Sequence, residues 1–319
     1  MNSLKHPHIR RLDTKKDLFP VAELIETCFG DFMDEDAWIY VRQIRRAARD
    51  QKLVYWTPGA GEMVSYPLNG FVWENTGEII ANLSLIPFNR NRQWVYLIAN
   101  VAVDPEHRNK GIAQELTKFA INHLKTQKVS AAWLQVREDN EIAKNLYLKY
   151  GFEEITRRAN WLSAEPFQPN IIQNNAVAIL PRNKGAWPAH HQWLDQIYPE
   201  ELRWYLPFNI PHFQPSLLNT IKSLLDKDQM SHWAGYYQDE LIGVVSIEKS
   251  RQAADRLWIA PKENYQEVII RHLLPFARLQ HNLNRQLNVN FPAHQGISAF
   301  QAAGFKLLNN LIWMEAKLT

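Results

Sequence analysis

The spacing of hydrophobic residues in the first 50 positions predicts one short strand followed by two helices. Residues 8–14 fit a strand, and the apolar positions that follow recur at helical spacing. A second helix is predicted over residues 35–49, after an acidic loop. The apolar face of the first helix carries Leu18, Val21, Leu24, Ile25 and Phe29.

Three strands are predicted next, at residues 70–73, 79–86 and 94–103. The segments NTGE and NRNR between them are typical of hairpin turns. The third strand is apolar at nearly every position, which is typical of a strand covered on both faces of its sheet.

A helix over residues 110–125, a strand at 131–136, a helix at 140–150 and a strand at 155–162 complete this half. Gly151 stands where a glycine commonly ends a helix. The order of elements predicts a mixed α/β domain.

The second half repeats this order. Residues 257–277 align with 101–121, which places Pro261 on Pro105, and residues 294–308 resemble 141–155 with a matching Gly-Phe pair. Two matches in the same order favour an internal duplication over chance similarity.

A segment without periodicity separates the two halves. Residues 163–175 carry two prolines and several Asn and Gln side chains, as a linker does. We therefore expect one domain at 1–165, a linker at 166–175 and a second domain at 176–319.

Composition narrows the class of protein. A length of 319 residues suits two domains, and 46% hydrophobic with 22% charged residues is typical of globular proteins. A net charge of +3 is too small for a dedicated nucleic-acid-binding face. The absence of a long apolar run or an apolar leader predicts a cytoplasmic protein that binds no membrane.

Two candidate reactive groups carry little weight. Cys28 is the only cysteine, so no internal disulfide can form, and its place on an apolar helix face favours packing over catalysis. The histidines lack the spacing and partners of metal ligands, so no metal site is predicted.

The sequence VAVDPEHRNKGIAQEL at 101–116 predicts a strand, a basic loop and a helix start. Unpaired N–H groups at a helix start attract anions, and Gly111 lets a phosphate approach the backbone closely. Arg108 and Lys110 add positive charge. Without further support, an ordinary solvated loop is the better interpretation of so short a pattern.

Further support comes from a resemblance to the GNAT superfamily of N-acetyltransferases. Its cofactor-loop pattern, R/Q-x-x-G-x-G/A, is matched at residues 108–113, and its N-x-x-A-x-x-x-Y-x-x-x-G-F signature at 140–152. The opening strand and helix also look like those of the superfamily. The resemblance covers roughly residues 8–162.

The resemblance implies two tandem GNAT-like domains, each a mixed, mostly antiparallel sheet flanked by helices. It also implies acetyl-CoA as cosubstrate, with its pantetheine arm between two separated strands near residues 100–103 and 134–136. Tyr147 becomes the acid that protonates the leaving thiolate; without the resemblance, core packing is its better interpretation. The implied cofactor-binding residues are Val101, Ala102, Val103, Arg108, Asn109, Lys110, Gly111, Ile112, Ala113 and Asn140.

A general base is missing from the expected place. Many GNAT members carry a glutamate on the strand that ends here in WVYLIANVAV, which has none. Candidates are Glu74, Asp31, Asp34 and Glu35, each of which is equally well explained as a solvated surface acid. Together, an acidic loop would favour a cationic amine substrate.

The second half departs from the cofactor pattern. The positions that match the basic loop hold Asn264, Gln266, Glu267 and Ile269, and Phe300 replaces the tyrosine. A glutamate repels phosphate and an isoleucine crowds the turn. We expect a degenerate copy that keeps the fold without the chemistry.

The function expected from the sequence is transfer of an acetyl group from acetyl-CoA to a primary amine, with a small-molecule acceptor favoured. Two alternatives remain open. One is a non-catalytic acyl-CoA-binding or scaffold protein, and the other is acetylation of a protein N-terminus or lysine. The sequence leaves the acyl chain length and the oligomeric state open.

Overall fold

The computed structural model describes residues 6–50, 69–90, 93–165, 177–215, 230–281 and 284–318. Contacts divide the chain into two compact units. Unit 1 holds residues 1–156 together with 312–319, and unit 2 holds residues 157–311. The linker expected at 166–175 lies outside the described residues. No described helix is long and apolar enough to cross a membrane.

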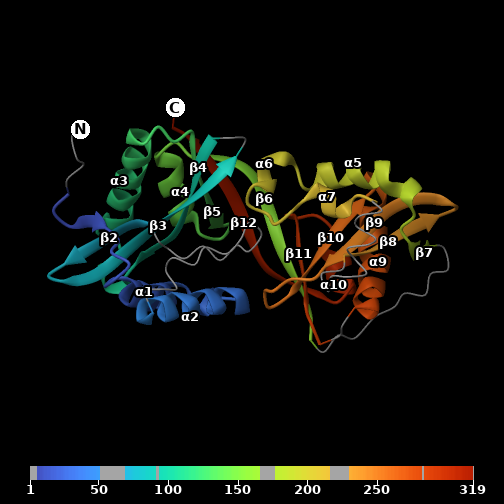
Figure 1. Ribbon diagram of the computed structural model, residues 1–319, viewed down its shortest axis with the longest axis horizontal. Coiled ribbons are helices and arrows are strands. Elements are labelled where there is room, and N and C mark those ends of the chain that lie inside the picture. The colour runs from blue at the N-terminus through green and yellow to red at the C-terminus, as the bar shows by residue number, and fades with distance from the viewer. Residues whose placement is uncertain are drawn as a thin grey trace. The chain divides into compact units, whose positions relative to one another are not determined.

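Unit 1 is a sheet between two pairs of helices (Figure 1). Its strands are β1 (Ile9–Arg11), β2 (Gly70–Asn75), β3 (Glu78–Arg90), β4 (Gln93–Val103) and β5 (Ala131–Arg137). Its helices are α1 (Leu18–Phe29), α2 (Glu35–Arg49), α3 (Ile112–Thr126) and α4 (Glu141–Lys149). The strand order is β1-β2-β3-β4-β5, and β12 (Phe305–Lys317) follows β5.

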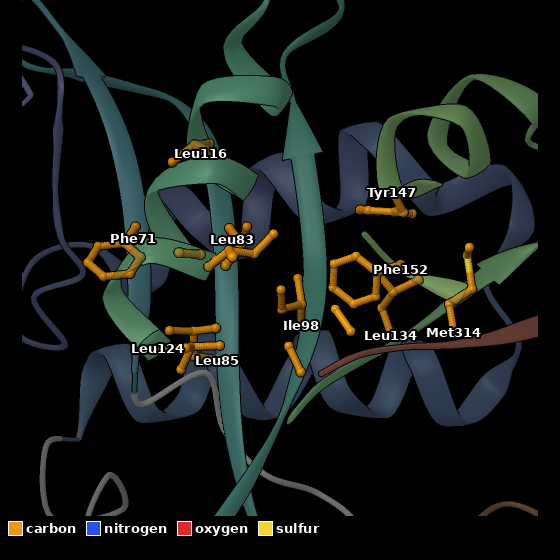
Figure 2. Packing of buried hydrophobic residues seen from close by; sticks show 14 of the residues in the cluster. Phe71, Leu83, Leu85, Ile98, Leu116, Leu124, Leu134, Tyr147, Phe152 and Met314 are labelled. Carbon is orange, nitrogen blue, oxygen red and sulfur yellow. The ribbon is translucent and has the colours of Figure 1, made fainter. Parts of the chain in front are cut away.

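Alternation along the strands gives this sheet two buried faces. One cluster joins Leu83, Ile98 and Leu134 to α3 and α4, and Met314 of β12 belongs to it (Figure 2). A second cluster packs Val72 against α1 and α2. The apolar face predicted for α1 is largely confirmed, because four of its five positions are buried.

The elements predicted for the first half are all present. The two helices at 18–29 and 35–49 have the expected bounds. The third begins two residues later than expected, at Ile112, because the preceding Gly111 has a left-handed backbone with φ +77°. The NTGE turn joins β2 to β3. Since β3 extends to Arg90, the NRNR turn falls partly in that strand and partly outside the described residues.

Unit 2 repeats the arrangement of strand, helix, strand, helix and strand. Its strands are β6 (Glu153–Ser163), which starts in unit 1, β7 (Val177–Pro181), β8 (Ser231–Tyr237), β9 (Glu240–Glu248), β10 (Asp255–Pro261) and β11 (Leu287–Pro292). Its helices are α5 (Trp187–Ile197), α6 (Glu200–Arg203), α7 (Ile210–Phe213), α9 (Gln266–Gln280) and α10 (Ile297–Ala302). The order is β6-β11-β10-β9-β8-β7.

The two copies of the internal repeat correspond at the glycine after the last helix and are offset at the proline after the central strand. Gly151 and Gly304 both follow the last helix of their unit, with φ +80° and +79°. Pro105 opens a short 3-10 turn, whereas Pro261 is the last residue of β10. The alignment by prolines is therefore displaced by about two positions in the loop, because the two loops differ in length.

The expected domain limits placed the whole second half in one domain. The contacts instead return residues 312–319 to unit 1, where β12 lies beside β5. The sequence pattern did not predict β12, and local periodicity contains no information about which sheet a strand joins.

Candidate functional site

The two central parallel strands of unit 1 separate part-way along their length. β4 pairs with β5 only from Val95↔Ala131 to Ile98↔Leu134. Beyond this point, no pairing joins the end of β4 to Gln135 and the rest of β5. The separation expected between the ends of these strands is therefore present.

A β-bulge lies at the point of separation. The register between β3 and β4 shifts between Asn82 and Ser84, which pair with Ala102 and Ala99. Asn100 lies in the bulge and has a positive φ of 50°. Because a bulge bends its strand, it directs the end of β4 away from β5. The edge of β4 is then free to pair with an extended ligand.

The loop after β4 presents backbone N–H groups at the start of α3. Asp104 accepts hydrogen bonds from the backbone of Glu106, which closes a short turn. Asn109 and Gly111 have positive φ values of 61° and 77°. A Cβ on Gly111 would meet no atom within 4 Å, so the space in front of this turn is open. An open helix start with free N–H groups is a favourable anion site.

Two basic side chains border this loop and are exposed. The guanidinium of Arg108 donates from Nε to the carbonyl oxygen of Val103 at 3.1 Å, and Lys110 donates to the carbonyl of Glu106 at 3.1 Å. Cys28 of α1 also donates to the Val103 carbonyl, at 3.3 Å. Burial raises the pKa of the Cys28 thiol, which favours its packing role over a nucleophilic one.

The helix α4 brings the second signature to the same end of the sheet. The side chain of Asn140 caps α4 by accepting a hydrogen bond from the backbone of Ala143 at 3.0 Å. Tyr147 points into the core and meets Phe152 edge to face, with ring centroids 5.8 Å apart (Figure 2). Burial raises the pKa of the Tyr147 phenol, so it stays protonated at neutral pH.

A hydrogen-bonded set of four neutral polar side chains lies on the opposite face of the sheet, beneath α2. We call it the amide cluster; its members are Tyr40, Asn82, Ser84 and Asn100. The Nδ2 of Asn100 donates to the hydroxyl of Tyr40 at 2.8 Å and to Ser84 at 3.3 Å. The Nδ2 of Asn82 donates to the Asn100 carbonyl at 3.0 Å. The cluster ties the bulge to β3 and α2.

One acceptor of the amide cluster is unsatisfied. Asn82 is fully buried, and its Oδ1 has no hydrogen-bond partner within the described part of the chain. Such an atom costs about 1–3 kcal/mol of stability. Sequence reasoning missed this cluster. The asparagine inside the apolar run LIANVAV was the available signal, because a polar residue in a doubly covered strand requires an explanation.

Three of the four acids considered as general bases have structural partners, and the fourth, Asp31, is exposed. Asp34 caps α2 by accepting from the backbone of Ala37 at 2.8 Å. Glu35 pairs with Arg42 at 2.7 Å, and Glu74 pairs with Arg10 at 2.5 Å. Each of these contacts favours the surface interpretation over the catalytic one.

The corresponding loop of unit 2 is shorter. Residues 104–111 separate β4 from α3, whereas only residues 262–265 separate β10 from α9. Ile269 is fully buried against β9, where a Cβ on Gly243 would lie 2.6 Å from its side chain. No open glycine turn precedes α9.

In unit 2 a tyrosine occupies the strand separation, and a phenylalanine replaces the tyrosine of the second signature. β10 pairs with β11 only at Asp255 and Arg256, and the backbone N–H of Ile259 donates to the Tyr198 hydroxyl at 3.2 Å. Ile259 is the third residue beyond the last pair, as Val101 is in unit 1. Phe300, the counterpart of Tyr147, is fully buried and stacks on Trp161 with centroids 4.6 Å apart.

In the parts of the chain that the structure describes, no three His, Cys, Asp or Glu side chains come together as metal ligands.

Comparison with known proteins connects this geometry to a family. The model of the acetyltransferase (GNAT) family matches residues 30–152. The ribosomal protein bS18-alanine N-acetyltransferase of Salmonella typhimurium is 34% identical over 114 residues, which cover 33% of this chain and 77% of that protein. The chain belongs to the GNAT family of acetyltransferases. The same enzyme from Haemophilus ducreyi is 44% identical over 80 residues, 25% of this chain, and the match spans about half of that protein, 52%.

Solved structures extend the likeness in fold to both units of this GNAT protein. A GCN5-related N-acetyltransferase from Sphaerobacter thermophilus has a TM-score of 0.59 at 12% identity, covering 99% of this chain and 97% of its own. A tandem GNAT protein from the clavulanic acid biosynthesis pathway has a TM-score of 0.50 at 13% identity, covering 98% of each chain. At this identity the comparison concerns the fold alone, which is that of two tandem GNAT-like domains.

Proposed function

We propose that unit 1 transfers an acetyl group from acetyl-CoA to a primary amine. The observation that carries this proposal is the separation of β4 from β5 beyond Ile98↔Leu134, next to the open glycine turn at Gly111. One feature offers a strand edge to an extended pantetheine arm, and the other offers N–H groups to a pyrophosphate. The family membership supports the same cosubstrate.

The residues proposed to hold acetyl-CoA fall into two groups. Backbone groups of Val101, Ala102 and Val103 pair with the pantetheine arm and the thioester carbonyl. The loop from Arg108 to Ala113, which includes Asn109, Lys110, Gly111 and Ile112, receives the pyrophosphate. Since the Asn140 Oδ1 already caps α4, only its Nδ2 is proposed to contact the cosubstrate.

Tyr147 is proposed as the general acid. The amine nitrogen attacks the thioester carbon, the C–N bond forms and the C–S bond breaks. The Tyr147 hydroxyl gives its proton to the departing thiolate and regains one from water, while the amine nitrogen releases a proton to water. The raised pKa of the phenol keeps this proton in place before the reaction.

Unit 2 is proposed to bind no acyl-CoA. The Tyr198 hydroxyl already occupies a backbone N–H of β10 at the strand separation. The short loop of unit 2 lacks the open glycine turn, and the side chain of Phe300 has no acidic proton to donate. A single cosubstrate site per chain follows from these contacts.

Two classes of acceptor are proposed. A small primary amine is the acceptor that the sequence favoured. The names of the matching relatives, which specify the alanine of a ribosomal protein, support a protein N-terminus as the second candidate.

The test is calorimetric titration of the whole chain with acetyl-CoA, followed by a thiol-release assay on amines. The panel includes small amines, an alanine-starting peptide and a lysine peptide. We expect one bound acetyl-CoA per chain and turnover of at least one amine class. Two bound molecules would contradict the assignment of unit 2, and binding without any turnover would favour the scaffold alternative.

A further inference from the structure

Gln135 is the first residue of β5 beyond the last pair with β4. Leu134 and Val136, on either side of it, belong to the core cluster under α3 and α4. Side chains alternate along a strand, so Gln135 points to the other face, toward α1 and α2. Trp133 faces the same way, because Arg90 of β3 stacks on its ring at 5.5 Å.

Asn82 and Ser84 also lie on this face, since they share the alternation of β3 with Arg90. Leu134 and Ile98 form the last pair between β5 and β4. Gln135 directly follows Leu134, and Asn100 lies two residues after Ile98. The side chain of Gln135 therefore lies on the same face of the sheet as the amide cluster, at the start of the strand separation.

The amide nitrogen of Gln135 is buried and has no hydrogen-bond partner among the residues that the structure describes. Two further amides on this side have an unsatisfied oxygen, Oδ1 of Asn82 on β3 and Oε1 of Gln43 on α2. Gln43 lies one helical turn after Tyr40. Buried polar atoms are nearly always hydrogen-bonded, so three unsatisfied amides on this side of the sheet favour a polar binding partner.

The charged groups named on this side of the sheet are held in ion pairs, and the phenol of Tyr40 is neutral. Tyr40 stays protonated because burial raises its pKa. Arg90 pairs with Glu315 at 3.5 Å. On β5, Arg137 stacks on Phe32 at 4.5 Å and pairs with Asp139.

From α1, Glu26 is paired with Arg45 of α2 at 2.5 Å, and Cys28 bonds the Val103 carbonyl. The hydrogen bonds that join the members of the amide cluster involve no carboxylate. Among the described residues, these contacts provide no partner for a buried ammonium ion.

We propose that Gln135, supported by the amide cluster, positions the acceptor amine in its uncharged form beside the thioester. This inference rests on the proposed acetyl transfer. The amide oxygen of Gln135 accepts an N–H of the amine, which leaves the nitrogen lone pair free to attack. The amide nitrogen is left to donate to a carbonyl oxygen of the acceptor or to a water.

A site for neutral amines selects acceptors by their own basicity. An α-amino group has a pKa of about 7.7–8.0 and a lysine side chain about 10.4. Near pH 7.5 the uncharged fraction is therefore roughly two to three hundred times larger for the α-amine. The site accordingly favours α-amines over lysine-type amines, which is opposite to the cationic preference expected from an acidic loop.

The experiment compares wild type, Gln135→Glu and Gln135→Leu over pH 6–10, with alanine amide and N-acetyl-lysine amide as acceptors. In wild type, kcat/KM rises with pH to the pKa of each acceptor. In Gln135→Glu the new carboxylate accepts the ammonium proton, so kcat/KM at pH 6.5 rises at least tenfold, toward the roughly 10²–10⁴-fold that a general base contributes. In Gln135→Leu the acceptor KM rises at least fivefold, while the affinity for acetyl-CoA is unchanged.

Gln127→Glu is the matched control, because Gln127 is exposed at the end of α3 and the change of charge is the same. Unchanged acceptor kinetics and pH profile in both Gln135 variants would overturn the inference, even if wild type is active. If wild type binds acetyl-CoA without turnover, the proposed acetyl transfer by the native chain is wrong. Turnover by Gln135→Glu alone would then still support the place of Gln135 beside the acceptor. No turnover by Gln135→Glu would overturn the inference about Gln135 as well.

Discussion

The side-chain amide of Asn100 donates a 2.8 Å hydrogen bond to the hydroxyl of Tyr40. This bond joins the bulge of β4 to the middle of α2, two elements 60 residues apart in sequence. The shape of β4 at the strand separation therefore depends on a contact made by a helix that supplies none of the residues proposed to bind acetyl-CoA.

Replacing Tyr40 by Phe removes the acceptor of this bond and keeps the ring. We expect unit 1 to lose about 1 kcal/mol of unfolding free energy, since Asn100 retains only its longer bond to Ser84. Urea titration followed by tryptophan fluorescence measures the loss. Tyr236→Phe is the control, because its hydroxyl accepts an exposed bond from Asn183 at 3.2 Å and its loss changes stability by less than about 0.5 kcal/mol. Equal losses in both variants would contradict the role of the buried bond.

Gly111→Ala tests the anion site with a matched strain control. Gly111 and Gly77 both have positive φ, +77° and +88°, and a Cβ on either meets no atom within 4 Å. Each alanine variant should lose about 1–2 kcal/mol from its left-handed backbone. Only Gly111→Ala should also weaken acetyl-CoA binding, measured by calorimetry, and Gly111→Glu should weaken it further by charge repulsion. If Gly77→Ala weakens binding equally, the loop is not the phosphate site.

Tyr147→Phe removes the proposed acid and keeps the ring packed on Phe152. The kcat for acetyl transfer should fall roughly 10²–10⁴-fold, the range of a general acid, with the acetyl-CoA dissociation constant unchanged. Steady-state thiol release and calorimetry separate the two effects. Tyr150→Phe, at the end of the same helix, should leave kcat within twofold. A Tyr147→Phe variant with full activity would assign this side chain to packing alone.

A second pH dependence is predicted for two buried histidines of unit 2. Burial lowers the pKa of His232 to about 3, and burial also lowers the pKa of its neighbour His190 well below the usual value. Both rings are neutral when folded and take up protons on unfolding. The stability they confer is present above about pH 6.5 and is lost as the pH falls toward 3.

For His232 alone, the loss between pH 7.5 and pH 5 is about 2 kcal/mol. Urea titrations at the two pH values measure it. His232→Gln should flatten the dependence, whereas His191→Gln, at a half-exposed ring whose contact is with Asp195, should not. An unchanged slope in His232→Gln would show that folding leaves the pKa of His232 near its usual value.

Local pattern was sufficient to predict the elements of the first half of the chain. The helix at 35–49 was predicted to the residue, because Asp34 is a strong N-cap and the apolar positions recur at helical spacing. The separation of the two central strands followed from the family resemblance and is present in the pairing of β4 with β5.

The amide cluster could not be predicted in the same way. Its bonds join residues of β3, β4 and α2, and no local pattern relates Tyr40 to Asn100. The hydrogen bond from Ile259 to Tyr198 in unit 2 is a similar case, since these two residues meet only after the chain has folded. The roles of Asn140 and Tyr147 remain predictions, which the variants above test.

The placement of residues 312–319 in unit 1 has a consequence for synthesis on the ribosome. Domains usually fold as they emerge, the N-terminal one first. Here the edge of β5 waits for β12, which is made only after the residues of unit 2. During that interval the nascent chain exposes an apolar strand edge, the kind of surface that trigger factors and other holding chaperones protect. A fragment cut at residue 165 would keep that edge exposed permanently, so expression of the isolated first half is expected to give aggregates.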